Sequence, residues 1–211
     1  MSRLLILGAG GHGQVVAEAA EATGDWREIS FIDDREGCLT ANSNWTILGP
    51  TSSLSVLRAE YRSIVIAIGD NNRRLAFYRK LQELGFAFPI IIHPRASVSK
   101  YAQVGPGTVV FAQAVINVAA TIGAVCIVNT GASIDHHCSL EDAVHVAPGA
   151  VLAGTVSVGT AALIGLGSAV REGTRIGANA VLGAGAVAVQ DIRDGTTATG
   201  VPAVAQATVS K

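Results

Sequence analysis

The sequence has few charged residues and no excess of either sign. Its 211 residues include 15 Lys and Arg against 16 Asp and Glu, which gives a formal net charge of −1. A protein that binds nucleic acid or an anionic membrane surface needs a basic footprint, because phosphate contacts supply much of that affinity. We therefore expect no nucleic-acid partner.

Cysteines and long apolar runs are also scarce. The three cysteines, Cys38, Cys126 and Cys138, lack metal-ligand spacing, and the last two stand among small residues, where buried thiols are ordinary. We infer a reducing cytoplasm and assign Cys138 to the core rather than to nucleophilic chemistry. No helical apolar run of about 18 residues and no signal-peptide pattern occur, so we expect neither a membrane span nor export.

Aromatic residues make up only 5% of a chain that is 49% hydrophobic and contains 24 glycines. Small and β-branched residues must therefore fill the core, which we expect to be thin and repetitive. Charge is uneven as well, because only seven charged residues lie between Val98 and Val189. This shift predicts two domains, residues 1–93 and residues 94–211, the second ending in a C-terminal tail.

The second half of the sequence repeats every six residues. An aliphatic residue recurs from Val98 to Leu182 without an insertion, and a small residue stands two positions before each one. Both columns must face inward, so short strands turn at each hexad and three hexads close a triangular coil. This predicts a parallel β-helix of about five coils. The pattern resembles the hexapeptide-repeat proteins, which implies that the helix is left-handed.

The first half has the order of a small Rossmann-like βαβ unit in an α/β domain. Residues 3–7 form an apolar run that ends in GAGGHG, a helix is expected over residues 14–23, and a second strand precedes Asp33 and Asp34. Glycines let backbone N–H groups approach a phosphate at a helix N-terminus. A unit of about 92 residues is nearer half of a dinucleotide fold, so we favour a mononucleotide-linked ligand over NAD and over a purely structural turn.

A polar cluster interrupts the repeat. Three of the five histidines, His136, His137 and His145, lie within it, and Gly154 stands one coil after His136. A base beside a free backbone N–H suits acyl transfer, so His136 is a candidate general base, with a solvated corner residue as the alternative. His145 lies half a coil away from His136. In a three-fold assembly, a neighbouring chain brings its own His136 close to this His145 more easily than the same chain does.

The second ring nitrogen of His136 needs an acceptor that fixes its tautomer. His137, Asp135 and Asn117 are the candidates, and we favour Asp135 because a carboxylate also stabilises an imidazolium. We then expect Asp135→Asn to lower kcat at least about tenfold and His137→Gln to cost less.

The motifs GAGGHG, FIDD, AIGDNNRR, IIHPRASVS, SIDHHC, HVAPGA and GVPA follow in order. With them the chain resembles the bacterial sugar acetyltransferases grouped with sialic-acid O-acetyltransferases and nucleotide-linked 4-amino-4,6-dideoxysugar N-acetyltransferases. The resemblance implies a homotrimer that uses acetyl-CoA and no metal, with His136 as the base and the Gly154 N–H on the thioester carbonyl. It also implies contacts to the nucleotide-sugar and to acetyl-CoA, by Gly10, Gly11, His12, Asp33 and Asp34 and by His145, Leu166 and Ala184, respectively.

Two positions depart from that family pattern. The carboxylate that commonly follows the catalytic histidine is His137 here, and the basic residue after the terminal G-x-P-A is Val204. The resemblance still implies an N-acetyltransferase that acts on a nucleotide-linked 4-amino-4,6-dideoxysugar in bacterial surface-polysaccharide, such as lipopolysaccharide, or glycan biosynthesis. O-acetylation of a sialic acid or a related sugar is the alternative. A β-helical zinc lyase and a non-catalytic nucleotide-binding scaffold are the other classes, and the nucleotide base is left open among UDP, GDP, dTDP and CMP.

Overall fold

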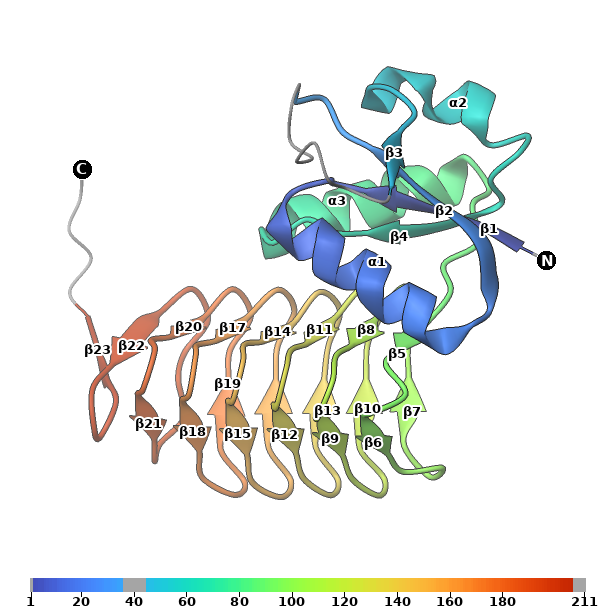
Figure 1. The fold of residues 1–211 in the computed structure, drawn as a ribbon. Coiled ribbons are helices and arrows are strands. Elements are labelled where there is room, and N and C mark those ends of the chain that lie inside the picture. Colours follow the sequence, from blue (N-terminus) through green and yellow to red (C-terminus); the bar gives the residue numbers. More distant parts are fainter. Residues whose placement is uncertain (1, 36–44, 207–211) are drawn as a thin grey trace.

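The computed structural model describes residues 2–35 and 45–206, so Cys38 lies outside the described residues. A parallel sheet with strand order β3-β2-β1-β4 forms the first domain (Figure 1). Its strands are β1 (Ser2–Leu7), β2 (Trp26–Ile32), β3 (Thr46–Ile47) and β4 (Ser63–Ile66). Its helices are α1 (Gly11–Thr23), η1 (Thr51–Ser53), α2 (Leu54–Leu57) and α3 (Asn71–Glu83).

Alternation along β1 places helices on both faces of this sheet. Leu4 and Ile6 pack in a buried cluster with α1, whereas Leu5 and Leu7 pack in a second cluster with α3. The strand order reverses between β2 and β4, on the two sides of β1, and such a switch point leaves a crevice at the carboxyl ends of the strands. The α/β prediction is confirmed.

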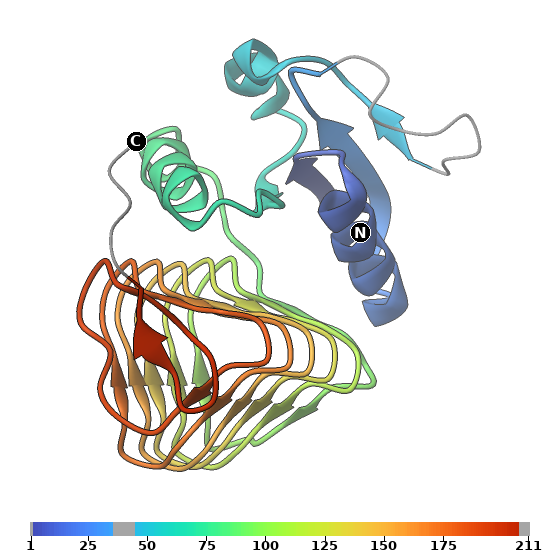
Figure 2. The ribbon, with the colours of Figure 1, turned by 90° about the vertical axis from the view of Figure 1, so that its left-hand side faces the viewer.

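The second domain is a left-handed parallel β-helix with three sheets (Figures 1 and 2). The β14 sheet contains β5 (Ile91–Ile92), β8 (Val109–Val110), β11 (Ile127–Val128), β14 (His145–Val146), β17 (Leu163–Ile164), β20 (Val181–Leu182), β22 (Thr197–Thr199) and β23 (Val204–Ala205). The β12 sheet contains β6 (Ser97–Val98), β9 (Val115–Ile116), β12 (Ser133–Ile134), β15 (Val151–Leu152), β18 (Ala169–Val170) and β21 (Val187–Ala188). The β13 sheet contains β7 (Gln103–Val104), β10 (Thr121–Ile122), β13 (Ser139–Leu140), β16 (Ser157–Val158) and β19 (Arg175–Ile176).

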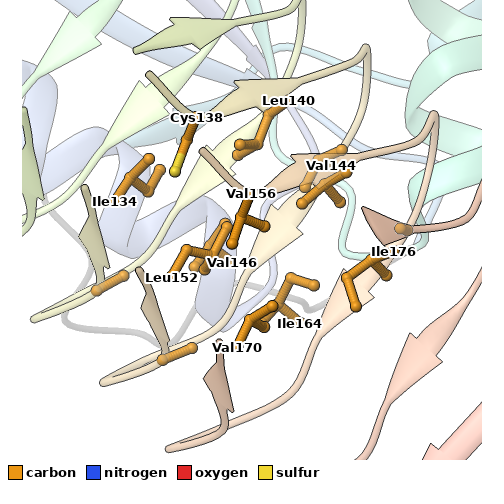
Figure 3. Packing of buried hydrophobic residues seen from close by; sticks show 14 of the residues in the cluster. Ile134, Cys138, Leu140, Val144, Val146, Leu152, Val156, Ile164, Val170 and Ile176 are labelled. Carbon is orange, nitrogen blue, oxygen red and sulfur yellow. The ribbon is translucent and has the colours of Figure 1, made fainter. Parts of the chain in front are cut away.

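The six-residue columns face inward as predicted. The aliphatic column from Val110 to Leu182 and most of the small column form one buried cluster that follows the helix axis (Figure 3). Cys138 belongs to this cluster at 1% exposure, and burial raises the pKa of its thiol, which agrees with its assignment to the core. At each corner from Gly107 to Gly185 the sixth residue has a positive φ, so the repeat also carries the left-handed backbone that turns the chain.

The first domain lies on one side of this prism. Residues of α1 and α3 share buried clusters with the β14 sheet and with the edge that joins it to the β13 sheet, which we call the α3 edge (Val125, Ala143 and Ala161). The edge between the β12 and β13 sheets, which we call the His136 edge (Val118, His136 and Gly154), is the vertex opposite the β14 sheet (Figure 2). It therefore points away from the first domain of its own chain. The division of the chain at residues 93 and 94 remains a prediction.

Candidate active site

His136 stands at the turn between β12 and β13, where its side chain is exposed in the single chain. Parallel pairing with a shift of one coil puts Gly154 directly beside it, and the Thr155 N–H donates to the His136 carbonyl. A Cβ atom built on Gly154 would lie 2.5 Å from His136 Cε1 and 2.6 Å from Nε2. The imidazole therefore occupies the space that a side chain at residue 154 would need.

The Gly154 backbone leaves a donor at this position. Its carbonyl accepts from the Gly173 N–H, whereas no described residue accepts a hydrogen bond from its own N–H. An imidazole and an unused backbone N–H thus lie side by side, as the sequence predicts. A base and a donor in this arrangement suit proton removal and stabilisation of a developing oxyanion.

Asp135 accepts no hydrogen bond from the His136 ring among the described residues, so its role in orienting that ring stays a prediction. Asp135 Oδ1 accepts from the His136 backbone N–H at 2.7 Å and from Asn117 Nδ2 at 2.9 Å. These hydrogen bonds, first that of Asn117, lower the pKa of the carboxyl group. An aspartate side chain at a turn readily accepts a hydrogen bond from the next backbone N–H. The Asp135 carboxylate therefore stabilises the turn.

His137 contacts the imidazole instead. Its Nδ1 lies 3.1 Å from Nδ1 of His136, and the two rings meet edge to face. His137 occupies a corner position of the repeat, with a left-handed φ of 59°. One of the two Nδ1 atoms must donate, and a His136 Nδ1–H leaves Nε2 of His136 as the free base.

A second candidate site lies in the first domain at the carboxyl ends of β1 and β4. The glycine turn has Gly8 at φ 108°, and Gly13 packs against the Gly8 carbonyl so closely that no Cβ fits. The predicted helix starts earlier than expected, at Gly11, so the first-turn N–H groups of α1 face the turn. A pocket of ≈ 400 Å³ opens there, and Gly10, Gly11, His12, Asp33, Asp34 and Arg35 are among the residues that line it.

The acidic residues of this pocket have partners within the chain. Asp33 accepts from the Ala9 N–H and from the Arg35 guanidinium, and the Arg35 hydrogen bond is the main cause that holds the Asp33 pKa below its usual range. Asp34 accepts from the N–H and hydroxyl of Thr51. Arg35 and Arg73, which the sequence reasoning did not single out, add two cationic side chains to the lining. Arg35 directly follows the FIDD motif and Arg73 belongs to NNRR. These motifs alone do not identify the two arginines as binding residues, and only the pocket geometry does.

The predicted acetyl-CoA residues lie on a third part of the surface. His145 is on β14, and Leu166 and Ala184 are exposed at the edge between the β14 and β12 sheets, which we call the Leu166 edge. His145 stands across the prism from His136, as its sequence spacing predicts, whereas Leu166 and Ala184 lie at a different edge of the prism. One chain therefore has an imidazole with its donor, a glycine-turn pocket and an exposed edge on separate surfaces.

His12 and His145 are half-buried where the two domains meet. The His12 ring packs edge to face on Phe111 of the β-helix, and His145 Nε2 lies 3.1 Å from Asn129 Nδ2. Burial first and the charge of Arg74 second lower the pKa of each histidine to about 4. Both rings are therefore neutral near pH 7.

This neutral burial predicts an acid-sensitive fold. Because both pKa values lie below the ordinary 6.5, the unfolded chain takes up these protons first, so the stability is present above about pH 6.5 and is lost toward pH 4. We expect calorimetry to show a melting temperature that falls over this range, and His145→Gln to reduce the slope. A constant melting temperature from pH 6.5 to pH 4 contradicts the prediction.

The described residues contain no helix long and apolar enough to cross a membrane. Over the same part of the chain, no three His, Cys, Asp or Glu side chains come together in a group that could hold a metal ion.

Comparison with known proteins places these features in context. Residues 3–81 match the family model of the PglD N-terminal domain. UDP-N-acetylbacillosamine N-acetyltransferase of Bacillus subtilis (strain 168) is 38% identical over 114 residues, which cover 53% of this chain and 52% of that protein. The match thus spans about half the length of this curated relative.

Two solved structures match along nearly their whole length. The acetyltransferase domain of PglB from Neisseria gonorrhoeae FA1090, in complex with acetyl coenzyme A, is 42% identical with a TM-score of 0.93, and the match covers 97% of this chain and 98% of that one. PerB from Caulobacter crescentus, in complex with CoA and GDP-perosamine, is 38% identical with a TM-score of 0.93, and the match covers 98% of each chain.

Proposed function

Because the chain belongs to the bacterial hexapeptide-repeat sugar acetyltransferases, we propose that it transfers the acetyl group of acetyl-CoA to the amine of a nucleotide-linked amino sugar. The observation that carries this proposal is the His136 imidazole against Gly154 in a chain that also has a glycine-turn pocket. We propose a 4-amino-4,6-dideoxysugar as the acceptor and surface-polysaccharide or glycan biosynthesis as the setting. The unpaired thiols of Cys126 and Cys138 support a reducing cytoplasm.

The pocket at the glycine turn suits the phosphates of the nucleotide. Backbone N–H groups at the N-terminus of α1 and the cations Arg35 and Arg73 favour negative charge there. Gly10 lies against the Arg35 guanidinium, at 3.2 Å for a built Cβ, so Arg35 stands over the turn. Asp33 then acts by holding Arg35 in place, and Asp34 by holding Thr51, in addition to any contact with ribose or base.

Gly11→Val tests this pocket. A Cβ on Gly11 meets no atom within 4 Å, so the larger side chain is compatible with the fold but fills space at the pocket. We expect the KM for the nucleotide-sugar to rise at least about tenfold and the KM for acetyl-CoA to stay unchanged. Tight NAD binding without affinity for any sugar nucleotide would reverse the assignment. Gly13→Ala is the contrasting variant, because its Cβ overlaps the Gly8 carbonyl and should destabilise the domain.

In the proposed reaction His136 is the general base and no covalent acyl-enzyme forms. As the sugar amine attacks the thioester carbonyl carbon, His136 Nε2 takes the proton that the amine nitrogen loses, and the Gly154 N–H donates to the developing oxyanion. The carbon–sulfur bond then breaks, and the thiolate of CoA receives the proton from the imidazolium.

The ring contacts predict which neighbour supports the base. His137→Ala removes the group at Nδ1 of His136, so we expect kcat to fall about tenfold, or about 1.4 kcal/mol in barrier. Asp135→Asn keeps an oxygen that accepts from the His136 N–H, so we expect a smaller loss. Steady-state kinetics with saturating acetyl-CoA decides the order. A larger loss for Asp135→Asn would restore the carboxylate to the supporting role.

We propose that the active protein is a homotrimer. The outward positions of the β12 sheet include Val115, Val151, Ala169 and Val187, and Val151 is 46% exposed, whereas the outward residues of the β13 sheet are polar. An apolar sheet face of this kind favours a protein partner. A second copy on it brings the His136 edge of one chain toward the Leu166 edge of the next, which supports a site shared between chains. A fully active monomer in sedimentation at micromolar concentration would exclude this.

A thermal-shift screen identifies the substrate most directly. Sugar nucleotides based on UDP, GDP, dTDP and CMP are tested with CoA, and the hits are then assayed with acetyl-CoA. An N-acetylated product supports the proposal. An O-acetylated sugar establishes the alternative reaction, and binding without turnover establishes a nucleotide-binding scaffold.

A further inference from the structure

Arg74 is a buried guanidinium without a carboxylate partner among the described residues. It lies on the second turn of α3 and is 1% exposed. Its Nε donates to the Val125 carbonyl at 2.7 Å, and Nη2 donates to the Ala143 carbonyl and to Asn71 Oδ1 at 2.8 Å. Nη1 donates to the carbonyls of Ile68 and Gly69 at 2.8 and 3.3 Å. The guanidinium thus has an acceptor for each of its N–H groups.

These acceptors come from the wall of the glycine-turn pocket and from the β-helix. Ile68 and Gly69 line the glycine-turn pocket. Val125 and Ala143 are corner residues of successive coils on the α3 edge, with φ of 47° and 57°. Asn71 extends the same ladder, because its Nδ2 donates to the carbonyls of Ala161 and Ala162 in the next coil. The start of α3 therefore binds three consecutive coils while Arg74 also holds the pocket wall.

The coils that Arg74 binds continue into the β14 sheet. Val125 leads into β11 and Asn129, and Ala143 leads into β14, where His145 pairs in register with Ile127. A charge buried in this way is costly to leave without its acceptors, so the loop and the coils are held as one unit. A shift of the pocket relative to the coils breaks several of these bonds together.

We propose that Arg74 is a positioning residue that fixes the nucleotide pocket at a set distance from the two coils that carry His136, His145 and Gly154. This proposal rests on the proposed function. A substrate held by its nucleotide places its amine correctly only if the pocket keeps a fixed position relative to the coils. The binding energy of the nucleotide at the pocket then raises kcat, because it holds the amine in the reactive position. Lysine cannot replace arginine here, because its compact ammonium has three donors and no planar fork.

The test compares two substrates that accept the acetyl group, each assayed with wild type and with Arg74→Lys. One is the nucleotide-linked amino sugar, and the other is the same amino sugar as a simple glycoside without the nucleotide. We expect kcat for the linked acceptor to fall at least about tenfold, and kcat/KM for the unlinked acceptor to stay within about twofold, because the unlinked amine does not use the pocket. Arg79→Lys, the same change at an exposed residue of α3, is the matched control.

An equal loss for both acceptors would show a general effect on the fold and overturn the proposal, as would no loss. If Arg74→Lys does not fold, Asn71→Ala is used instead, because it removes only the hydrogen bonds to the third coil and to Arg74. We then expect the same preferential loss of kcat for the nucleotide-linked substrate, but a smaller one. Hydrogen exchange gives a readout apart from activity. Amides of residues 67–71 and 143–147 should exchange faster together in Arg74→Lys and not in Arg79→Lys. A wild type that acetylates neither amine refutes the proposed function, and the exchange result then decides by itself whether Arg74 couples the two parts.

Discussion

Replacing His136 with alanine is expected to lower kcat by roughly 10²–10⁴ while the chain keeps its fold. The side chain is exposed at a turn, where it contacts Gly154 and the Nδ1 atom of His137, so its loss opens no cavity in the core. The loss should fall on kcat, because the imidazole acts on the proton that moves during transfer. Release of CoA thiol measures the rate. A kcat near that of wild type would make His136 a solvated corner residue.

Complementation between two impaired chains distinguishes a shared site from a site within one chain. The His136→Ala chain keeps its pocket and the Gly11→Val chain keeps its imidazole, and the two features lie on opposite sides of the prism in one chain. If a site combines the imidazole of one chain with the pocket of the next, each mixed trimer has one intact site and about one third of the wild-type activity when the nucleotide-sugar is kept well below the raised KM of Gly11→Val. The chains are co-expressed with different tags and purified through both. Mixed trimers that gain no activity over the two parent variants would place both groups in the same chain.

The repeat shows how far sequence alone reaches in this protein. The small and aliphatic columns determine which residues face inward, so the sheets and the core follow from the spacing. Stacking by one coil also predicts that Gly154 lies beside His136 and that Asn117 lies beside Asp135. Such contacts are predictable because the regular backbone sets them, with little dependence on rotamers.

Side-chain direction at the corners was less predictable. Asp135 and His137 flank the imidazole equally in sequence, but in the structure the His137 ring contacts His136, whereas the Asp135 carboxylate closes the turn. Arg74 was missed for a related reason. Two of its carbonyl acceptors, those of Val125 and Ala143, lie 51 and 69 residues away, and backbone carbonyls leave no signal in the sequence. Contacts between a side chain and distant backbone depend on how the domains pack.

Gly154→Ala is expected to lower kcat about 10²-fold with little change in melting temperature. The new Cβ would come within 2.5 Å of the His136 ring, which real Cβ atoms do not tolerate, so the imidazole must swing out of place. Because that ring is exposed, it moves without disturbing the core. The φ of Gly154 lies outside the left-handed region, so alanine adds no backbone strain.

A double-mutant cycle separates displacement of the base from other effects of the added methyl group. If Gly154→Ala acts only by moving His136, then adding it to His136→Ala causes no further loss, because the overlapping ring is already absent. Strong non-additivity in kcat is therefore the expected result, with the backbone N–H of residue 154 still present in both variants. A double variant that loses a further 10²-fold would mean that the methyl group blocks the thioester or misplaces the N–H donor. In that case the absence of a side chain at Gly154 would be needed to make room for the thioester oxygen rather than for the imidazole.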